Sequence, residues 1–251
     1  MSESELTELE NVQNLNTHRD ILDKDGFAVI DNIYSAAEIE AIIKTLNEVK
    51  ASNPNFRKTA GLFAIRQLLK ELPQLFPMVF NDKLRLIIGG LFRPEYFVVK
   101  SIYFDKPGNS NWFVAYHQDL TISVDKKIEL PGYGPWTVKQ NQFGVQPPLG
   151  ILEENYTIRI HLDDTNEANG ALKVIPTSHK KGIYRAENID WSVEQEISCN
   201  VPSGGIMIMK PLLLHSSSRT HNDKNRRVVH IEFSKADLDD GINWAEKMDV
   251  V

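Results

Sequence analysis

The chain is poor in cysteine, because Cys199 is the only one among its 251 residues. A single cysteine excludes an intrachain disulfide framework and leaves no pair of thiolates for a metal site. Long apolar runs are also missing, and residues 2–8 are acidic where a secretory signal would be basic and then apolar. We therefore expect a cytoplasmic protein with no membrane partner.

The chain also has fewer positive than negative residues. The 28 Lys and Arg residues are outnumbered by 34 Asp and Glu, which gives a net charge of -6, and the basic residues are scattered along the chain. Such a distribution offers no stripe for a phosphate backbone, so we expect no nucleic-acid partner. The hydrophobic content of 41% is enough to bury a large core. We expect one domain over residues 1–251.

The chain divides by pattern into a first part, residues 1–95, that is mainly helical and a second part, 96–251, that is mainly strand. A short strand is predicted at 26–31. A helix follows, because Ser35 and Glu38 form a capping box in front of an apolar stripe. Two further helices are predicted at 62–72 and 82–91.

Six strands are predicted in the second part, separated by clusters of Gly, Pro, Asn or Asp. This pattern is typical of a sandwich or a barrel. The connection at 124–150 is unusually long for a compact domain, and such connections are often functional, so we predict that it is a lid. The six predicted strands cover residues 97–104, 112–118, 156–162, 172–176, 205–209 and 226–233.

Two histidines and one aspartate are the strongest indication of chemistry. His117 and Asp119 lie two residues apart on a predicted strand, so their side chains point to the same face and can bind one metal ion together with His215. Three protein ligands on one side leave the opposite coordination positions open for oxygen and a bidentate co-substrate. This arrangement is typical of non-haem Fe(II) oxygenases.

An arginine eleven residues after His215 completes the pattern. A guanidinium binds a carboxylate through two parallel hydrogen bonds, so Arg226 is the expected anchor for the far carboxylate of a co-substrate. Its neighbour Arg227 points to the opposite face. We predict that Val229, Ile231 and Phe233 pack under the helices with Arg227, and that Val228, His230 and Glu232 face inward with Arg226. With the opposite strand orientation, Arg227 would be the anchor.

Most of the chain resembles the phytanoyl-CoA dioxygenase family of Fe(II)- and 2-oxoglutarate-dependent oxygenases. The resemblance is carried by residues 25–31, 116–119, 163–179 and 215–227, in matching order and spacing. It implies a double-stranded β-helix, a cupin-like jelly roll in which N-terminal helices pack on one sheet. It also implies that His117, Asp119 and His215 bind the iron.

The resemblance assigns further roles. Arg226 and Ser217 match positions that contact 2-oxoglutarate, and Trp136 matches a tryptophan that lines the same pocket. The reaction implied is oxidative decarboxylation of 2-oxoglutarate with O2, which releases succinate and CO2 and hydroxylates a small-molecule substrate. Because Asp119 keeps the carboxylate that related halogenases lack, a halogenase is disfavoured.

The substrate is the least defined part. Arg159 and His161 occupy a strand face that the resemblance places inside the barrel, where many relatives carry Trp and a small residue. A buried cation there needs an anionic partner or a ligand. With Arg66 and Lys100 as further candidates for substrate contact, the chamber favours a small polar or anionic metabolite over a fatty acyl thioester.

Two other classes remain open. The first is a cupin-type metalloprotein that binds Fe, Mn or Zn without 2-oxoglutarate, in which Arg226 has only a structural part. The second is a catalytically idle relative that binds a ligand and uses the triad only to hold the barrel together. Release of succinate separates both from a dioxygenase. The oligomeric state is not predicted.

Overall fold

The computed structural model describes residues 3–48, 56–59, 62–92, 94–108, 110–139, 142–238 and 241–250. Its α-helices are α1 Glu3–Asp25, α2 Ala36–Asn47, α3 Leu68–Glu71, α4 Phe76–Val79, α5 Asp82–Leu91 and α6 Leu149–Glu154, with 3-10 turns at Pro73–Leu75, Glu167–Asn169, Ser178–Lys181 and Ala186–Asn188. Its strands are β1 Phe27–Ile30, β2 Phe56–Thr59, β3 Leu62–Arg66, β4 Phe97–Lys106, β5 Val114–His117, β6 Ile122–Val124, β7 Trp136–Lys139, β8 Gln142–Val145, β9 Tyr156–His161, β10 Leu172–Val174, β11 Ile197–Cys199, β12 Ile206–Met209, β13 His215–Ser217, β14 Arg226–Ser234 and β15 Met248–Asp249.

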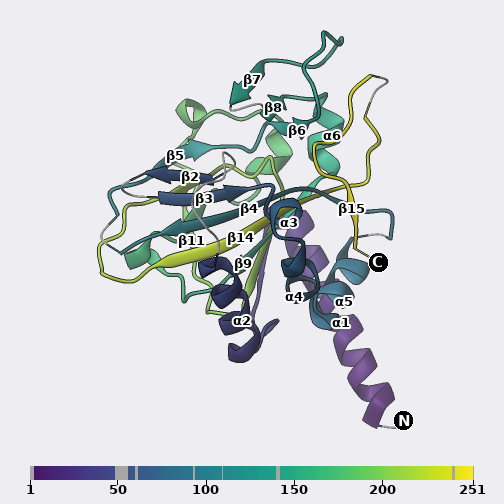
Figure 1. Ribbon diagram of the computed structural model, residues 1–251, viewed down its shortest axis with the longest axis vertical. Coiled ribbons are helices and arrows are strands. Elements are labelled where there is room, and N and C mark those ends of the chain that lie inside the picture. Colours follow the sequence, from purple (N-terminus) through teal and green to yellow (C-terminus); the bar gives the residue numbers. More distant parts are fainter. Residues whose placement is uncertain are drawn as a thin grey trace.

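Two antiparallel sheets form the centre of the molecule (Figure 1). The larger, which we call the major sheet, has the order β1-β12-β9-β14-β4-β3-β2, with β15 also paired to β4. The minor sheet has the order β11-β10-β13-β5. Leu172 and Val174 of the minor sheet pack against Met207 and Met209 of the major sheet, so the two sheets face each other as in the predicted jelly roll.

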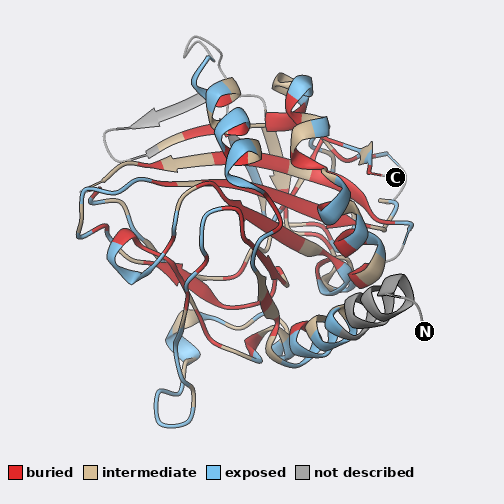
Figure 2. Ribbon diagram, turned by 90° about the horizontal axis from the view of Figure 1, so that it is seen from below, coloured by how far each residue is buried: buried red, intermediate tan, exposed pale blue. Residues whose placement is uncertain are grey.

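Helices cover the outer face of the major sheet. Val229, Ile231 and Phe233 point from β14 into an apolar cluster that includes Ile42 of α2 and Ile88 of α5. Figure 2 shows buried positions along the strands and exposed positions on the outer sides of the helices. The prediction that Val229, Ile231 and Phe233 pack under the helices, on the strand face of Arg227, is therefore confirmed.

The first 95 residues also contribute strands to the major sheet. The strand after residue 26, the helix capped by Ser35 and the helix at 82–91 are confirmed, and Ser35 and Glu38 form the predicted capping box. The helix predicted at 62–72 is wrong in its first half. Leu62–Arg66 is strand β3, paired with β4, and only Leu68–Glu71 is helical after Gln67 in a left-handed conformation.

Tertiary packing explains why residues 62–66 form a strand instead of the predicted helix. Ile65 is fully buried in the cluster under the helices, whereas Ala64 pairs with Phe104 on the other face of the sheet. A strand partner forty residues away in the sequence thus overrides an apolar pattern that resembles a helix. The six predicted strands are all present in part, with β4 and β14 longer than the predicted strands by one or two residues.

Residues 124–150 have structure of their own. Strands β6, β8 and β7 form a small three-stranded sheet that stands above the two main sheets in Figure 1. Trp136, Phe143 and Val145 belong to an apolar cluster with Phe97 of β4 and Trp244 near the C-terminus. The segment is therefore a packed element, and its action as a lid stays a prediction. Among the described residues, no helix combines the length and apolar character needed to cross a bilayer.

The packing of α5 on the major sheet gives a matched pair of substitutions. Ile88 is 2% exposed and Leu86, two residues away on the same helix, is 70% exposed. We expect Ile88→Ala to lower the free energy of unfolding by about 2–5 kcal/mol, because it leaves a cavity. Leu86→Ala should change the free energy of unfolding by about 0.5 kcal/mol or less. Urea denaturation measures both, and equal effects would contradict this packing.

Candidate metal centre

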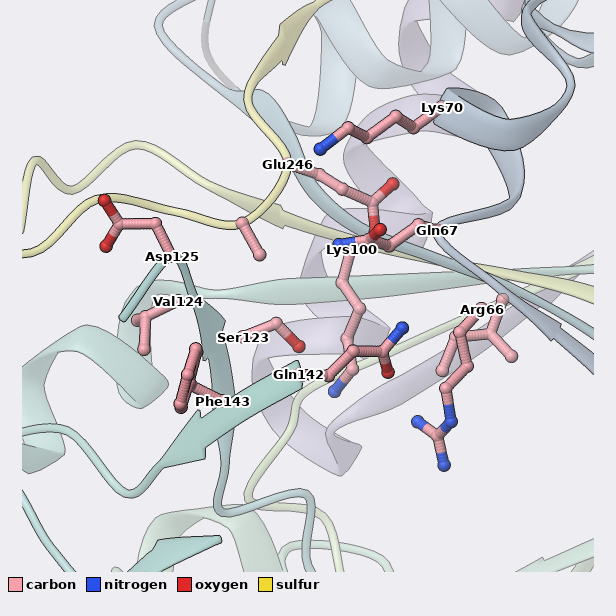
Figure 3. Close-up of a pocket in the computed structure, with 12 residues that line it drawn as sticks. Arg66, Gln67, Lys70, Lys100, Ser123, Val124, Asp125, Gln142, Phe143 and Glu246 are labelled. Atoms are coloured by element: carbon pink, nitrogen blue, oxygen red, sulfur yellow. The ribbon is translucent and has the colours of Figure 1, made fainter. Parts of the chain in front are cut away.

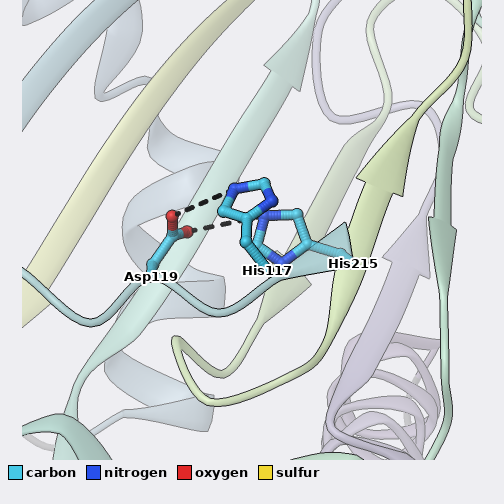
Figure 4. Close-up of side chains that lie close together, drawn as sticks. All are labelled: His117, Asp119 and His215. Carbon is cyan, nitrogen blue, oxygen red and sulfur yellow. Dashed lines mark ion pairs between the residues drawn. The ribbon is translucent and has the colours of Figure 1, made fainter. Parts of the chain in front are cut away.

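His117, Asp119 and His215 meet at one point on the inner side of the minor sheet. His117 ends β5 and His215 begins β13, and the two are direct partners across the strands. The Nε2 atoms of His117 and His215 each lie 3.8 Å from a carboxylate oxygen of Asp119 (Figure 4). One ligand atom from each residue lies within 4.8 Å of the others. All three can therefore bind the same ion.

Backbone carbonyls orient both imidazoles. The Nδ1 atom of His117 lies 2.9 Å from the Ala115 carbonyl oxygen, and that of His215 lies 2.8 Å from the Leu213 carbonyl oxygen. A carbonyl oxygen only accepts hydrogen bonds, so Nδ1 carries the proton and Nε2 presents a lone pair to the centre. Donation from the second ring nitrogen is the usual way in which proteins fix a metal-binding histidine.

The protonation states also suit a cation. Burial lowers the pKa of His215 to about 4, so its imidazole is neutral at neutral pH. Burial alone would raise the pKa of Asp119, but the His215, His230 and His117 imidazoles, when protonated, and the Lys100 ammonium hold this pKa below its usual range. Asp119 is therefore ionised. Two imidazole nitrogens and one carboxylate form a donor set that fits a divalent iron ion.

Gln118 points away from this centre, as alternation predicts, and holds the strand end in place. Its amide nitrogen donates to the carbonyl oxygens of Gly182, at 2.8 Å, and Leu212, at 2.6 Å. Its amide oxygen accepts from the Tyr184 N–H at 2.8 Å. These contacts tie the end of β5 to two loops, so they restrain the two metal-ligand candidates on either side of Gln118.

Arg226 lies on the inner face of the major sheet, opposite the triad's sheet. Its side chain is buried, Nη2 donates to the Ser217 hydroxyl at 3.3 Å, and Nε has no partner among the described residues. Burial, together with the charge of Arg159, lowers the pKa of Arg226 to about 9. Arg227 instead points outward and forms a bidentate pair with Asp163. The available guanidinium is thus that of Arg226.

The predicted substrate residues lie on the same inner face. Arg159 on β9 donates from Nη1 to Nδ1 of His230 at 3.0 Å, and its Nε has no partner among the described residues. His161 contacts the Thr165 hydroxyl at 2.7 Å, and burial keeps the pKa of this histidine well below its usual value. Arg159 is close enough to Asp119 and His215 for its charge to act on them, whereas His161 lies near Arg159 and Arg226.

Lys100 and Arg66 lie further along the sheet, at a cavity of about 300 Å³ between β3, β4 and the small sheet of β6, β7 and β8. Figure 3 shows Lys100 and Arg66 at this cavity, with Gln142 between them. Lys100 also pairs with Glu232 at 2.8 Å. The four predicted substrate residues therefore divide into an inner pair, Arg159 and His161, and a pair at the cavity.

A buried chain of polar groups connects the two pairs, and the sequence did not predict it. Arg159 contacts His230, whose Nε2 lies 3.1 Å from Glu232, which in turn accepts from Lys100. Alternation placed His230 and Glu232 on the inward face, as found. Their partners depend on the strand order β9-β14-β4, which the sequence does not display.

Trp136 lies apart from the other predicted co-substrate residues. It is on β7 opposite Val145 and packs in the apolar cluster with Phe97 and Trp244. No hydrogen bond or ring contact joins Trp136 to Arg226 or Ser217 among the described residues. The structure thus brings Arg226 and Ser217 together and places Trp136 in the wall formed by the small sheet.

The triad generates a direct test of metal binding. We expect Asp119→Ala to weaken Co(II) binding by about 100-fold, because it removes the only anionic ligand. Isothermal titration calorimetry measures the affinity. The control Asp249→Ala changes an exposed carboxylate on β15 and should leave the affinity unchanged. Equal Co(II) affinities in wild type and Asp119→Ala would show that the ion binds elsewhere.

Known structures share this fold at low sequence identity. EctD from S. alaskensis with bound Fe superposes with a TM-score of 0.67 and 16% identity, covering 87% of this chain and 75% of the other. HygX from Streptomyces hygroscopicus, with nickel, 2-oxoglutarate and hygromycin B bound, gives a TM-score of 0.61 and 17% identity over 87% of this chain and 86% of the other. These similarities confirm the predicted jelly-roll class.

A relative in sequence is a probable alpha-ketoglutarate-dependent hypophosphite dioxygenase from Stutzerimonas stutzeri, and alpha-ketoglutarate is another name for 2-oxoglutarate. It is 23% identical over 237 residues, which cover 87% of this chain and 78% of the relative. The model of the family described as phytanoyl-CoA dioxygenase (PhyH) matches residues 22–228, which include the triad and Arg226. The chain therefore belongs to the phytanoyl-CoA dioxygenase (PhyH) family.

Proposed function

We propose that this chain is an Fe(II)- and 2-oxoglutarate-dependent dioxygenase that hydroxylates a small polar or anionic metabolite. One observation carries the proposal. Three metal-ligand atoms converge on the inner side of one sheet, and a buried guanidinium with no carboxylate partner among the described residues faces them from the other sheet. A metal at the triad and a carboxylate at Arg226 together define the two ends of a bound 2-oxo dicarboxylate.

His117, Asp119 and His215 would hold the iron, and Arg226 with Ser217 would hold the distal carboxylate of 2-oxoglutarate. The bound pair supplies the oxidation: O2 gives one oxygen atom to succinate, formed with loss of CO2, and the other to a C–H bond of the substrate. The chain's own part is to orient the co-substrate and to keep water from the reacting atoms. The two facing sheets, with the small sheet above them, would help to keep water out.

The charges on the inner face support an anionic or strongly polar substrate. Lys100 and Glu232 neutralise each other, while Arg159 forms no ion pair with a carboxylate among the described residues. An unpaired buried cation is costly, and an anionic group of the substrate would compensate it. The cavity of about 300 Å³ beside Lys100 and Arg66 suits a small molecule. Hypophosphite, named for the relative in Stutzerimonas stutzeri, is a small anion.

The cupin-type alternative differs in its use of Arg226. We expect Arg226→Met to weaken 2-oxoglutarate binding by about 10- to 100-fold, because the substitution removes charge-assisted hydrogen bonds to a carboxylate. Anaerobic titration of Fe(II)-loaded protein, followed by the weak visible charge-transfer band, measures this affinity.

The neighbouring residue supplies the control. Arg227→Met removes the outward pair with Asp163 and should lower stability while the affinity for 2-oxoglutarate stays the same. A wild-type protein that binds Fe(II) but shows no such band and releases no succinate would favour the cupin-type alternative. Binding of ligand without any turnover would favour the idle relative.

The substrate class has its own test. We expect small carboxylates, phosphonates or other oxyanions to stimulate succinate release, and Arg159→Met to abolish the stimulation. The variant should keep its 2-oxoglutarate charge-transfer band, because Arg159 lies outside the Arg226–Ser217 pair. Stimulation by acyl-CoA esters alone would contradict the polar chamber.

A further inference from the structure

Lys106 is a buried cation that the proposed function has not used. It is the last residue of β4, and its side chain is 0% exposed. Lysine is rarely buried to this degree without a charged partner. It shares the inward face of β4 with Lys100, six residues earlier, because side chains on one strand face recur every two residues. Lys106 therefore points into the space between the sheets.

The partners of Lys106 do not neutralise its charge. The ammonium donates a hydrogen bond to the Ser218 carbonyl oxygen and lies 5.8 Å from the centre of the Trp112 ring. No carboxylate of the described residues forms an ion pair with it, and the adjacent Asp105 is on the outer face near Arg227. Burial, with the charge of Arg226 added, lowers the pKa of Lys106 to about 8.

Lys106 and Arg226 are direct partners across β4 and β14. Side chains at such positions lie on the same face a few ångströms apart at their Cβ atoms, and like charges placed there repel each other. Ser217 and Ser218 bring the two cations to the same short segment, since Arg226 donates to the Ser217 hydroxyl and Lys106 donates to the Ser218 carbonyl. Two buried positive groups thus lie beside one short segment of the chain.

Gly170 makes this close approach possible. A Cβ atom at this position would lie 2.6 Å from the Lys106 Nζ and 2.6 Å from the Ser218 carbonyl oxygen, and the backbone φ of +81° also favours glycine. The Gly170 carbonyl oxygen accepts from the Ser217 hydroxyl at 3.0 Å. The loop before β10 therefore holds Ser217 beside both cations.

We propose that Lys106 is a second positioning residue for the distal carboxylate of 2-oxoglutarate, acting with Arg226 and Ser217. The inference rests on the proposed function. An anion between the two cations relieves their repulsion and compensates the desolvation of both groups. A purely structural lysine would only need one uncharged donor for the Ser218 carbonyl oxygen, and its charge would have no use.

Two ligands distinguish a role of the Lys106 charge in binding from a purely structural role of its hydrogen bond to Ser218. 2-Oxoglutarate and 2-oxopentanoate share a 2-oxo acid end and a five-carbon chain, but only the first has a distal carboxylate. Lys106→Gln keeps a donor for the Ser218 carbonyl oxygen and removes the charge. Both ligands are titrated anaerobically into Fe(II)-loaded wild type and variant, and the charge-transfer band gives each dissociation constant.

We expect Lys106→Gln to weaken the binding of 2-oxoglutarate by about tenfold or more, as for loss of a charged hydrogen bond. The affinity for 2-oxopentanoate should stay unchanged. Lys210→Met serves as a control, because Lys210 is a half-buried lysine that packs over the Tyr156 ring and donates to the Glu153 carbonyl oxygen, remote from Arg226. It should change neither constant. An unchanged 2-oxoglutarate constant in Lys106→Gln, or equal weakening of both ligands, would overturn the proposal.

A second measurement needs no variant. In a crystal structure of the wild type with Zn(II) and 2-oxoglutarate, Lys106 Nζ should lie within about 3.2 Å of the distal carboxylate. A carboxylate bound by Arg226 alone, with Lys106 still directed only to Ser218, would also overturn the proposal. If the wild type binds no 2-oxoglutarate at all, the proposed function itself fails.

Discussion

The pairing of β5 with β13 is the constraint on which the site depends. It sets His117 directly opposite His215, so that both imidazoles lie on the inner side of the minor sheet. Because side chains alternate with period two, a slip of one residue in either strand would send one histidine to the outer side. Gln118 secures this register through three hydrogen bonds to neighbouring loops, and Asp119 follows on the same face as His117.

The major sheet supplies the positive charge that an anionic co-substrate or substrate beside the triad would need. Its inner face carries Lys106 and Arg226 at one end and Arg159 beside His230 in the middle, with Lys100 and Glu232 paired beyond them. These cations are buried between two sheets, where solvent screens charge poorly. Their desolvation is a standing cost to stability. Glu232 already offsets that cost for Lys100, and the proposed anionic ligands would offset it for Lys106, Arg226 and Arg159.

Several parts of this arrangement could be predicted from the sequence because they follow from local rules. The capping box at Ser35 and the helix Asp82–Leu91 depend on neighbouring residues, and the opposite directions of Arg226 and Arg227 follow from strand alternation. Other parts depend on long-range pairing. β3 was predicted as a helix because its partner β4 lies far along the chain, and Lys106 gained meaning only once its register with Arg226 was known. Trp136 was matched across a long connection whose own small sheet sets its position.

The whole site depends on one iron ion that two imidazoles and one carboxylate would hold. Anomalous diffraction at the iron absorption edge, from crystals grown anaerobically with Fe(II), tests it most directly. We expect a single strong peak within bonding distance of His117 Nε2, His215 Nε2 and an Asp119 carboxylate oxygen. A peak bound by other residues, or by only one of these three, would contradict it.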